Sequence, residues 1–463
     1  MDELKKLWAL AIPIIIAQVG TFAMGLVDTL LVGPMGREAL SALGLGNTLF
    51  FAVLIFGIGM MMSLDAWVSQ AFGAGQLADC SRGLAQGLWL ALIVSPLLIA
   101  VMTAMPHVLL ALNYPENMVD LAMQYMGPLR WGVYPMLCFA TYRSFMTALG
   151  VTRPLLFAVA LANVANFGLD LWFIHGGLGI EAQGVTGVAW STVLCRTFFL
   201  LPPLVLVVRF RADFQRFPRP NWRPDPKLLK QLALLGTPIG FQYMAEVGCF
   251  SLAGVLMGAM GTLPLAAHGV ALNLAALFFM VALGLGAAGA VRVGQNLGAG
   301  NREGVVRAGW TALGSALAYG TISAVVITIF RGQLVSMYRV EPEIFNLAVQ
   351  FMVIAAVFQL ADSTQATGVG VLRGLADTRR PLGIILFGYG VIAIPIGVLG
   401  AFVLDDDPRW IWVGLAVGLT VVAILLTLRF KKQVARVRSG ELRGVVDPMG
   451  TSSSTISAFE QNP

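Results

Sequence analysis

Two polar residues share one face of an apolar helical stretch, LANVANFGLDLWFI at residues 161–174. Asn166 and Asp170 are four residues apart, so an α-helix places their side chains one turn from each other. A carboxylate at membrane depth costs about 2.5–3.5 kcal/mol even on the lenient insertion scale. An ionisable residue at such a depth marks an ion or proton pathway by default, so this pair is a candidate cation-binding site.

A second carboxylate and a hydroxyl are expected at a similar depth. Asp28 ends a polar stripe at helical spacing in the first apolar stretch, whose other members are Gln18, Thr21 and Gly25. Asp28 and Asp170 lie about five residues from the outer ends of their predicted spans, and Thr192 lies about nine residues from the outer end of the next span. At about 1.5 Å per residue these depths agree within about two turns, so the three helices can converge.

The side chains of this first site offer carboxylate, amide and hydroxyl oxygens. Such an all-oxygen set suits a hard cation such as Na⁺. The same residues can hold a proton instead, because two close carboxylates in a low dielectric cannot both ionise easily. A polar network that only fixes helix packing is the plainer alternative. The predicted site residues, which would be the metal ligands if the cation is Na⁺, are Asp28, Asn166, Asp170 and Thr192.

Two further polar stripes run along apolar stretches in the second half of the chain. They consist of Gln242 and Glu246, and of Gln359, Asp362 and Gln365. A carboxylate near the middle of a span is expected to attract cationic substrates or to carry protons, with a structural network as the alternative. Phe358 stands beside Gln359 and offers an aromatic face to a cation, although an aromatic residue in a span more often packs.

Composition places these residues in a membrane. Of the 463 residues, 57% are hydrophobic and 12% are charged, whereas a soluble domain carries about 25% charged residues. Apolar runs near the ~20 residues needed to cross a bilayer recur along the chain, and such runs must be helices because the bilayer core has no water. The prediction is an all-α polytopic membrane protein. The net charge of +6 indicates no nucleic-acid partner, because topology explains it.

Short segments rich in polar residues, glycine or proline divide the chain into twelve predicted transmembrane helices. Their approximate ranges are 7–33, 45–72, 84–106, 118–148, 154–175, 183–208, 228–258, 264–297, 307–330, 343–374, 381–404 and 409–430. Placing the N-terminus inside collects most loop Lys and Arg residues on one side of the membrane and leaves few on the other. Both termini are therefore expected in the cytoplasm.

The chain repeats itself across its longest polar loop. SQAFGAG at 69–75 matches GQNLGAG at 294–300, and Pro13 and Pro238 keep the same separation of 225 residues. Six spans per repeat make the halves parallel, related by a pseudo-two-fold axis along the membrane normal. The predicted domains are a six-helix N-terminal lobe (1–208), a cytoplasmic linker (209–227), a six-helix C-terminal lobe (228–430) and a basic, disordered cytoplasmic tail (431–463).

Several motifs follow one another in a characteristic order. They are GLVDTLLVG (25–33), VSQAFGAG (68–75), the pair Asn166 and Asp170, GVAWST (187–192), PxxxQxxxE (238–246), FQLADSTQ (358–365) and LRGLADT (372–378). Their order and spacing resemble the multidrug and toxic compound extrusion (MATE) family of cation-coupled efflux transporters, in its bacterial NorM-like branch. The match covers residues 1 to about 432. Asp65, in SLDAWVSQAFGA, looks more like the eukaryotic branch.

This resemblance implies two lobes arranged as a V, alternating access, and antiport of organic cations and drugs against Na⁺ or H⁺. It implies that the four residues of the first site bind the coupling cation, and that Glu246 and Asp362 act in transport. Gln242, Phe358 and Gln359 are expected to contribute to substrate binding or coupling. The expected partners are cationic or amphipathic drugs and dyes and the lipid bilayer, with no cofactor, for a monomer in the bacterial inner membrane.

Other function classes fit the residues less well. A lipid-linked oligosaccharide flippase of the same fold superfamily is the main alternative, but such flippases favour basic cavities, and here acids outnumber arginines within the spans. An enzyme is disfavoured because HExxH, GxSxG and clustered His or Cys are absent, and ATP coupling because GxxxxGK[ST] is absent. Asp65 is expected either to act in transport or to pair with a basic residue near the cytoplasmic face.

Overall fold

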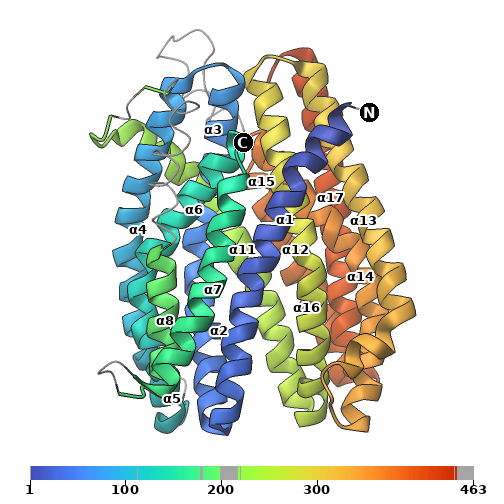
Figure 1. Cartoon of the computed structure of the whole chain (residues 1–463). Helices are drawn as coiled ribbons and strands as arrows, with labels where there is room; N and C mark the ends of the chain where they lie inside the picture. The colour runs from blue at the N-terminus through green and yellow to red at the C-terminus, as the bar shows by residue number, and fades with distance from the viewer. Residues whose placement is uncertain are drawn as a thin grey trace. The chain divides into compact units, whose positions relative to one another are not determined.

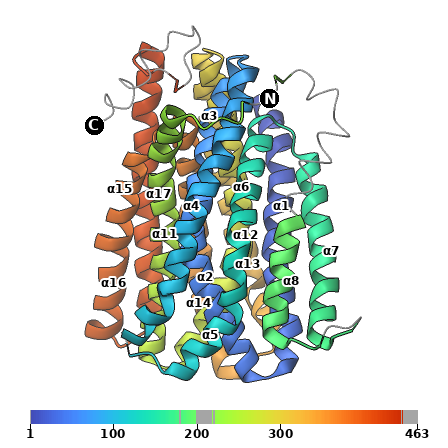
Figure 2. The same cartoon turned by 90° about the vertical axis from the view of Figure 1, so that its left-hand side faces the viewer.

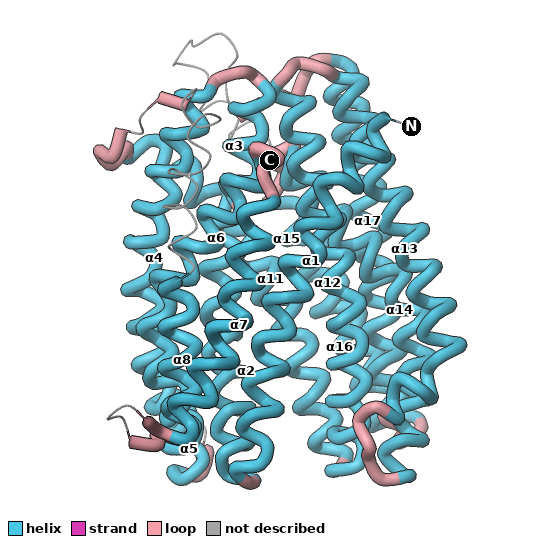
Figure 3. Tube along the Cα trace, viewed as in Figure 1, coloured by secondary structure: helices cyan, strands magenta, loops and turns pink. Residues whose placement is uncertain are grey.

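The computed structural model describes residues 2–111, 113–177, 181–198, 217–218, 221–442 and 444–445. Nearly all of these residues are helical, and Figure 3 shows loops as short connections at helix ends. A helix pairs its backbone polar groups internally, so it is the form that long apolar runs take in a bilayer. The predicted all-α fold class is therefore confirmed.

The helices follow the predicted spans closely (Figure 1). In the first half they are α1 (Asp2–Val32), η1 (Gly33–Met35), α2 (Arg37–Met61), α3 (Ser63–Gly73), α4 (Leu77–Ala111), α5 (Glu116–Leu129), η2 (Arg130–Gly132), α6 (Val133–Ala148), α7 (Arg153–His175) and α8 (Gly184–Phe198). In the second half they are α11 (Pro226–Met260), α12 (Thr262–Gly298), α13 (Arg302–Ser336), α14 (Pro342–Gly374), α15 (Arg379–Leu386), η3 (Phe387–Ala393), α16 (Ile394–Leu399), η4 (Gly400–Leu404) and α17 (Arg409–Ser439).

Ten helical segments in the described ranges are long and apolar enough to cross a membrane. They correspond to ten of the twelve predicted spans. The predicted span 118–148 is interrupted, because η2 separates α5 from α6 just after Pro128, which cannot donate a backbone hydrogen bond. The predicted span 183–208 begins as α8, and its residues 199–208 lie outside the described part of the chain.

The segment from α15 to η4 is wider than a regular α-helix. Both η3 and η4 are π-helices. Pro395 follows η3 at the start of α16, and its ring clashes with the carbonyl four residues earlier in a regular helix. The wider turns before Pro395 relieve that clash, and they also change which side chains of this segment face its neighbours.

Contacts divide the chain into two compact units. The N-terminal unit comprises Ile16–Leu64 and Gln76–Gly240, and the C-terminal unit comprises Met1–Ile15, Asp65–Gly75 and Phe241–Pro463. The units differ from the predicted lobes in three places. The first half of α1 and α3 belong to the C-terminal unit, and the part of α11 up to Gly240 belongs to the N-terminal unit. Within the N-terminal unit, α7 and α8 lie side by side (Figures 1 and 2).

Two ion pairs explain why these early segments belong to the C-terminal unit. Glu3 on α1 accepts two hydrogen bonds from Arg292 on α12, at 2.8 and 2.9 Å. Arg373 Nε on α14 lies 3.3 Å from Asp65 Oδ2 on α3, and both side chains are buried. Asp65 thus pairs with a basic residue, which was one of its two expected roles.

Close packing of α12 on α14 shapes the C-terminal unit. A Cβ atom at Gly370 would lie 2.1 Å from the backbone oxygen of Gly286, so this crossing requires a glycine. Further along the same helix pair, Gln359 Nε2 donates a hydrogen bond of 3.1 Å to the backbone oxygen of Ala275. The crossing therefore brings Gln359, one member of the predicted polar stripe of α14, against α12.

The predicted linker 209–227 is described only at residues 217–218 and from 221 onward. Its described end is attached to α4. Gln86 donates a hydrogen bond to the backbone oxygen of Arg223 at 2.9 Å and accepts one from the backbone nitrogen of Asp225 at 2.8 Å. This end of the linker is thus fixed within the N-terminal unit.

The helical part of the chain extends further than predicted. α17 continues to Ser439, so the first nine residues of the predicted tail 431–463 are helical and the boundary placed at 431 is too early. The cause is packing, because Gln433 is buried and its Nε2 donates to Asp377 Oδ2 at 2.5 Å. Residues 446–463 lie outside the described part of the chain, so the predicted disorder there stays a prediction.

Candidate cation and substrate sites

Three helices of the N-terminal unit bring the first predicted site together. Asp28 lies on α1, Asn166 and Asp170 lie on α7, and Thr192 lies on α8. The exposed fractions of the four residues are 4, 0, 0 and 3%, in that order. Residues from distant parts of the sequence thus meet at one buried point.

Two hydroxyl groups contact the Asp28 carboxylate. Thr192 Oγ1 lies 3.3 Å from Asp28 Oδ2, and Tyr125 on α5 donates from its hydroxyl to the same oxygen at 3.4 Å. Thr192 Oγ1 also lies 3.0 Å from the backbone oxygen of Val188. A hydroxyl has only one proton, so when Val188 accepts it the Thr192 oxygen is free to act as a ligand beside Asp28.

Four buried acceptor oxygens of this site have no donor in good hydrogen-bond geometry among the described residues, although Ser191 interacts with Asp170 and Asn166 with Asp28. The four oxygens are Asp28 Oδ1, Asn166 Oδ1 and both carboxylate oxygens of Asp170. Asn166 Nδ2 is within 3.5 Å of Ser191 Oγ, which turns the amide nitrogen toward α8. A buried acceptor without a partner costs about 1–3 kcal/mol, more if charged. A bound cation or proton would remove this cost.

Charge within the site is unbalanced. Asp28 and Asp170 interact electrostatically with each other, and Arg196, one turn beyond Thr192 on α8, adds a positive charge. The Arg196 guanidinium stacks over the Phe50 ring, with Cζ 4.7 Å from the ring centroid. With both carboxylates ionised the set carries one net negative charge, which one monovalent cation or one proton would neutralise.

The C-terminal unit holds a second pair of carboxylates, of which Asp362 is buried and Glu246 is half-buried. Glu246 lies on α11 and Asp362 on α14, and the two interact electrostatically. Glu246 Oε1 and Asp362 Oδ1 are buried and find no hydrogen-bond partner in the described ranges. Gln365, the last member of the predicted α14 stripe, forms a side-chain hydrogen bond with Glu246.

A tyrosine from the π-helix η3 completes this second cluster. The hydroxyl of Tyr389 donates to Gln365 Oε1 at 3.0 Å, and its side chain is buried. Because the amide oxygen of Gln365 is occupied by Tyr389, its amide nitrogen is the end that remains to face Glu246. Tyr389 is thus a positioning residue for Gln365.

Two predicted members of the second site have other neighbours. Gln242 Nε2 donates to the backbone oxygen of Thr378 at 2.6 Å, so this side chain ties α11 to the segment after α14. The Phe358 ring is 2% exposed and makes edge-to-face contacts with Phe250 and Trp412, at centroid distances of 6.0 and 6.1 Å. Packing within an aromatic cluster, rather than an open face for a cation, is therefore its role in this structure.

The sequence interpretation missed Tyr125, Ser191 and Tyr389. Tyr125 and Ser191 are single polar residues in otherwise apolar helices, a pattern too common to single them out. Within the described ranges there is also no group of three or more His, Cys, Asp and Glu residues that could hold a metal ion. The first site has two carboxylates, an amide and a hydroxyl, which is a donor set for a weakly held hard cation.

A polytopic helical membrane protein with buried carboxylates in each unit is the class that the fold and the sites define. The MatE family model matches residues 13–172 and 238–399, well over half of the chain. The chain therefore belongs to the MatE family, the multidrug and toxic compound extrusion transporters.

Individual relatives cover almost the whole chain. It is 35% identical to the probable multidrug resistance protein NorM of Bradyrhizobium diazoefficiens, over 94% of this chain and 95% of that protein. It is 34% identical to the multidrug resistance protein PmpM of Pseudomonas aeruginosa, over 94% of this chain and 92% of that protein. Among solved structures, the eukaryotic MATE transporter AtDTX14 shares the fold, with a TM-score of 0.86 and 20% identity over 95% of this chain and 99% of that one.

Proposed function

We propose that this protein is a secondary active multidrug efflux transporter, which exports organic cations and drugs in exchange for Na⁺ or H⁺ by alternating access. Its relatives NorM and PmpM are named as multidrug resistance proteins. The protein would act as a monomer in the bacterial inner membrane, with both termini in the cytoplasm and with no cofactor. It is not an enzyme in this proposal.

The observation that carries the proposal is the set of unpaired oxygens around Asp28 and Asp170. Burying two carboxylates is costly unless a counter-charge or proton reaches them. A cation that enters the set lowers this cost, so the loaded and empty forms of the site differ in free energy. That difference can drive a change of conformation in α1, because α1 supplies Asp28.

In the C-terminal unit, Glu246 and Asp362 are proposed to attract cationic substrate or to carry protons. Asp362 is buried, Glu246 is half-buried, and each has one buried oxygen without a hydrogen-bond partner among the described residues. Gln359 contributes a further unpaired amide oxygen from the same face of α14. Gln242 and Phe358 are proposed to act indirectly, by holding α11 and α14 in place.

The same carboxylates argue against a flippase for a lipid-linked oligosaccharide. An anionic lipid carrier would meet acidic groups in both units, and like charges across a binding surface cost several kcal/mol. On α14, the described residues include one buried arginine, Arg373, and its charge is already paired with Asp65. Cationic cargo therefore fits the described residues better.

Everted membrane vesicles provide the test. Efflux of a cationic dye such as ethidium would be followed while a Na⁺ gradient or a pH gradient is imposed separately. We expect transport with one of the two gradients and none without a gradient. Transport that needs ATP, or no transport of any cationic dye under either gradient, would contradict the proposal.

A further inference from the structure

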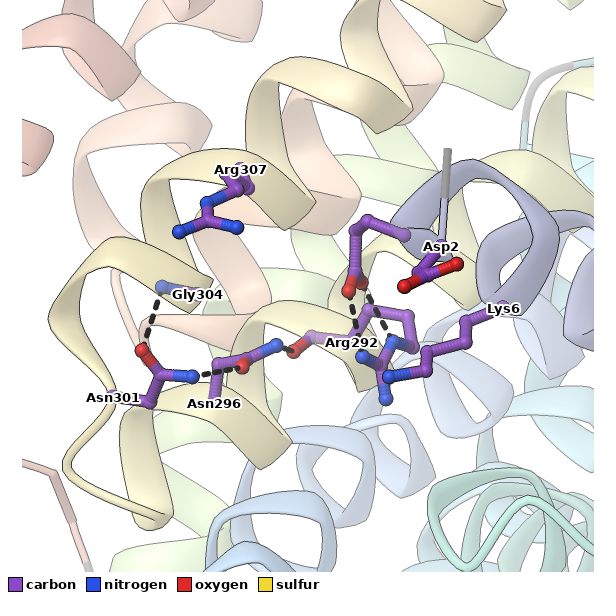
Figure 4. Close-up of a pocket in the computed structure, with 8 residues that line it drawn as sticks. Asp2, Lys6, Arg292, Asn296, Asn301, Gly304 and Arg307 are labelled. Atoms are coloured by element: carbon purple, nitrogen blue, oxygen red, sulfur yellow. Dashed lines mark hydrogen bonds and ion pairs between the residues drawn. The ribbon is translucent and has the colours of Figure 1, made fainter.

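A polar cavity of about 340 Å³ lies at one end of the C-terminal unit, away from the carboxylates described above. Three elements surround it, namely the first turns of α1, the last turns of α12 and the first turns of α13 (Figure 4). The lining residues are Asp2, Glu3, Lys6, Arg292, Asn296, Asn301, Gly304 and Arg307. Its volume is within the range of small-molecule sites, roughly 300–1,000 Å³.

The floor of the cavity is a rigid hydrogen-bonded frame. Arg292 is held by Glu3 at 2.8 and 2.9 Å and by Gln295 Oε1 at 2.9 Å. Asn296 Nδ2 donates to the backbone oxygen of Arg292 at 2.8 Å, and Asn301 Oδ1 caps α13 by accepting from the nitrogen of Gly304 at 2.9 Å. The frame fixes the ends of all three helices before any ligand arrives.

Positive charge remains once this frame is satisfied. Lys6, Arg292 and Arg307 contribute three positive charges and Asp2 and Glu3 two negative ones, which leaves a net charge of +1. Lys6 and Arg307 have no ion-pair partner among the described residues. Figure 4 shows Lys6 reaching toward Arg292, while Arg307 approaches from α13 on the other side. The N-terminal end of α13 adds a partial positive charge.

Exposed apolar residues lie further along two of the helices that line the cavity. Ile12 on α1 is 49% exposed, and on α13 Trp310 and Leu317 are 40 and 50% exposed. A tryptophan at this position suits the boundary between headgroups and acyl chains. A site at headgroup depth would have this arrangement, with polar groups at the helix ends and exposed apolar side chains on the following turns.

We propose that this cavity binds the phosphodiester headgroup of an anionic membrane lipid. A phosphodiester carries one negative charge, which balances the net charge of the cavity, and the acyl chains of the lipid would lie along the exposed apolar residues of α1 and α13. The lipid would hold the first turns of α1 against α12 and α13. Since α1 also carries Asp28, the lipid acts on the helix that supplies the first cation site.

Native mass spectrometry with added phosphatidylglycerol or phosphatidylcholine tests this proposal, because it needs no transport activity. We expect phosphatidylglycerol to bind better than phosphatidylcholine. The variants Lys6→Gln and Arg307→Gln should each weaken phosphatidylglycerol binding about fivefold, and together about 25-fold, as expected for two cationic contacts. Lys5→Gln is the matched control, since Lys5 is exposed beside Lys6 but does not line the cavity. It should bind the lipid as the unchanged protein does.

Three results would overturn the assignment. The double variant could bind phosphatidylglycerol as tightly as the unchanged protein, or Lys5→Gln could weaken binding as much as Lys6→Gln, which would indicate general surface attraction. Displacement of the lipid by millimolar inorganic phosphate would identify a soluble anion as the ligand instead. Elution volume and thermal midpoint of each variant check that it is folded. None of these readouts depends on the coupling ion or on the drug, so failure here leaves the proposed transport function standing.

Discussion

Thr192 Oγ1 lies 3.3 Å from Asp28 Oδ2, although 164 residues separate the two in the chain. This contact joins α8 to α1, and α7 supplies Asn166 and Asp170 to the same point. A cation bound there would draw all three helices together through its ligands. In the proposed mechanism, α1 is the helix that responds to cation binding and transmits the change to substrate.

Replacing Asp170 by Asn should leave a folded protein that no longer couples efflux to a cation. The variant keeps the size and hydrogen-bonding shape of the side chain but removes a charge that binds the cation. We expect dye efflux from everted vesicles to fall to background while expression stays normal. Asn163→Ala is the matched control on α7, because the hydrogen bond of Asn163 Nδ2 in the described part of the chain goes to the backbone oxygen of Val159 in its own helix, at 2.8 Å. If Asp170→Asn transports dye at the rate of the unchanged protein, Asp170 is not a ligand of the coupling cation.

Arg196→Gln should tighten cation binding at the first site. Removing a nearby positive charge leaves the carboxylates with a stronger attraction for Na⁺ or H⁺, by a factor on the order of ten at an effective dielectric near 20. Cation-induced quenching of tryptophan fluorescence would measure the affinity. Arg196→Lys keeps the charge and should change the affinity little. Weaker binding in Arg196→Gln would show that Arg196 instead holds the site together.

Replacing both carboxylates, as Glu246→Gln with Asp362→Asn, should change the export of substrates according to the charge of the substrate. If these carboxylates attract cationic cargo, export of ethidium should fall at least tenfold while export of neutral drugs falls little. The comparison is made in the same vesicles with the same imposed gradient. An equal loss for both classes of substrate would instead assign the pair to proton coupling or to structure.

Tyr389→Phe tests whether Tyr389 on η3 orients Gln365 toward Glu246. It removes one hydroxyl and the 3.0 Å hydrogen bond to Gln365 Oε1, at a cost of about 1 kcal/mol in stability. Gln365 is then free to turn its amide oxygen toward Glu246, which favours a protonated carboxyl group. We expect the pH at which transport is half-maximal to shift. Thr427→Val is the control. It removes a hydroxyl that donates to the backbone oxygen of Ala423 at 2.8 Å within α17, and it should leave this pH unchanged.

The first site could be predicted because its signals are local. Asn166 and Asp170 are one turn apart, and the depths of Asp28 and Thr192 follow from counting residues along straight helices. Such counting works as long as each helix keeps 1.5 Å per residue. It gave ten of the spans and the convergence of α1, α7 and α8.

The second cluster could be predicted only in part, because it depends on irregular backbone. Tyr389 contacts Gln365 from a π-helix. A prediction that assumes the 3.6 residues per turn of an α-helix does not place the Tyr389 side chain on that face. For Phe358 the sequence left two roles open, a face for a cation or packing. The structure shows packing against Phe250 and Trp412, which come from other helices that the sequence does not place beside it. The break between α5 and α6 was missed for a similar reason, since Pro128 alone did not distinguish a kink from an interruption.

The stability of the protein should depend on Asp65 and Arg373 matching each other, and two apolar residues should be able to replace them together. Removing one partner leaves an unpaired buried charge and costs about 3–5 kcal/mol, so Asp65→Asn and Arg373→Met should each lower the thermal midpoint strongly. Replacing both at once, as Asp65→Leu with Arg373→Met, restores an apolar interior of similar volume and should recover most of the loss. The thermal midpoint in detergent and dye efflux would be measured for all three variants. If the double variant recovers both the thermal midpoint and dye efflux, the role of the pair is to attach α3 to α14. A stable double variant that cannot transport would show that Asp65 also acts in transport.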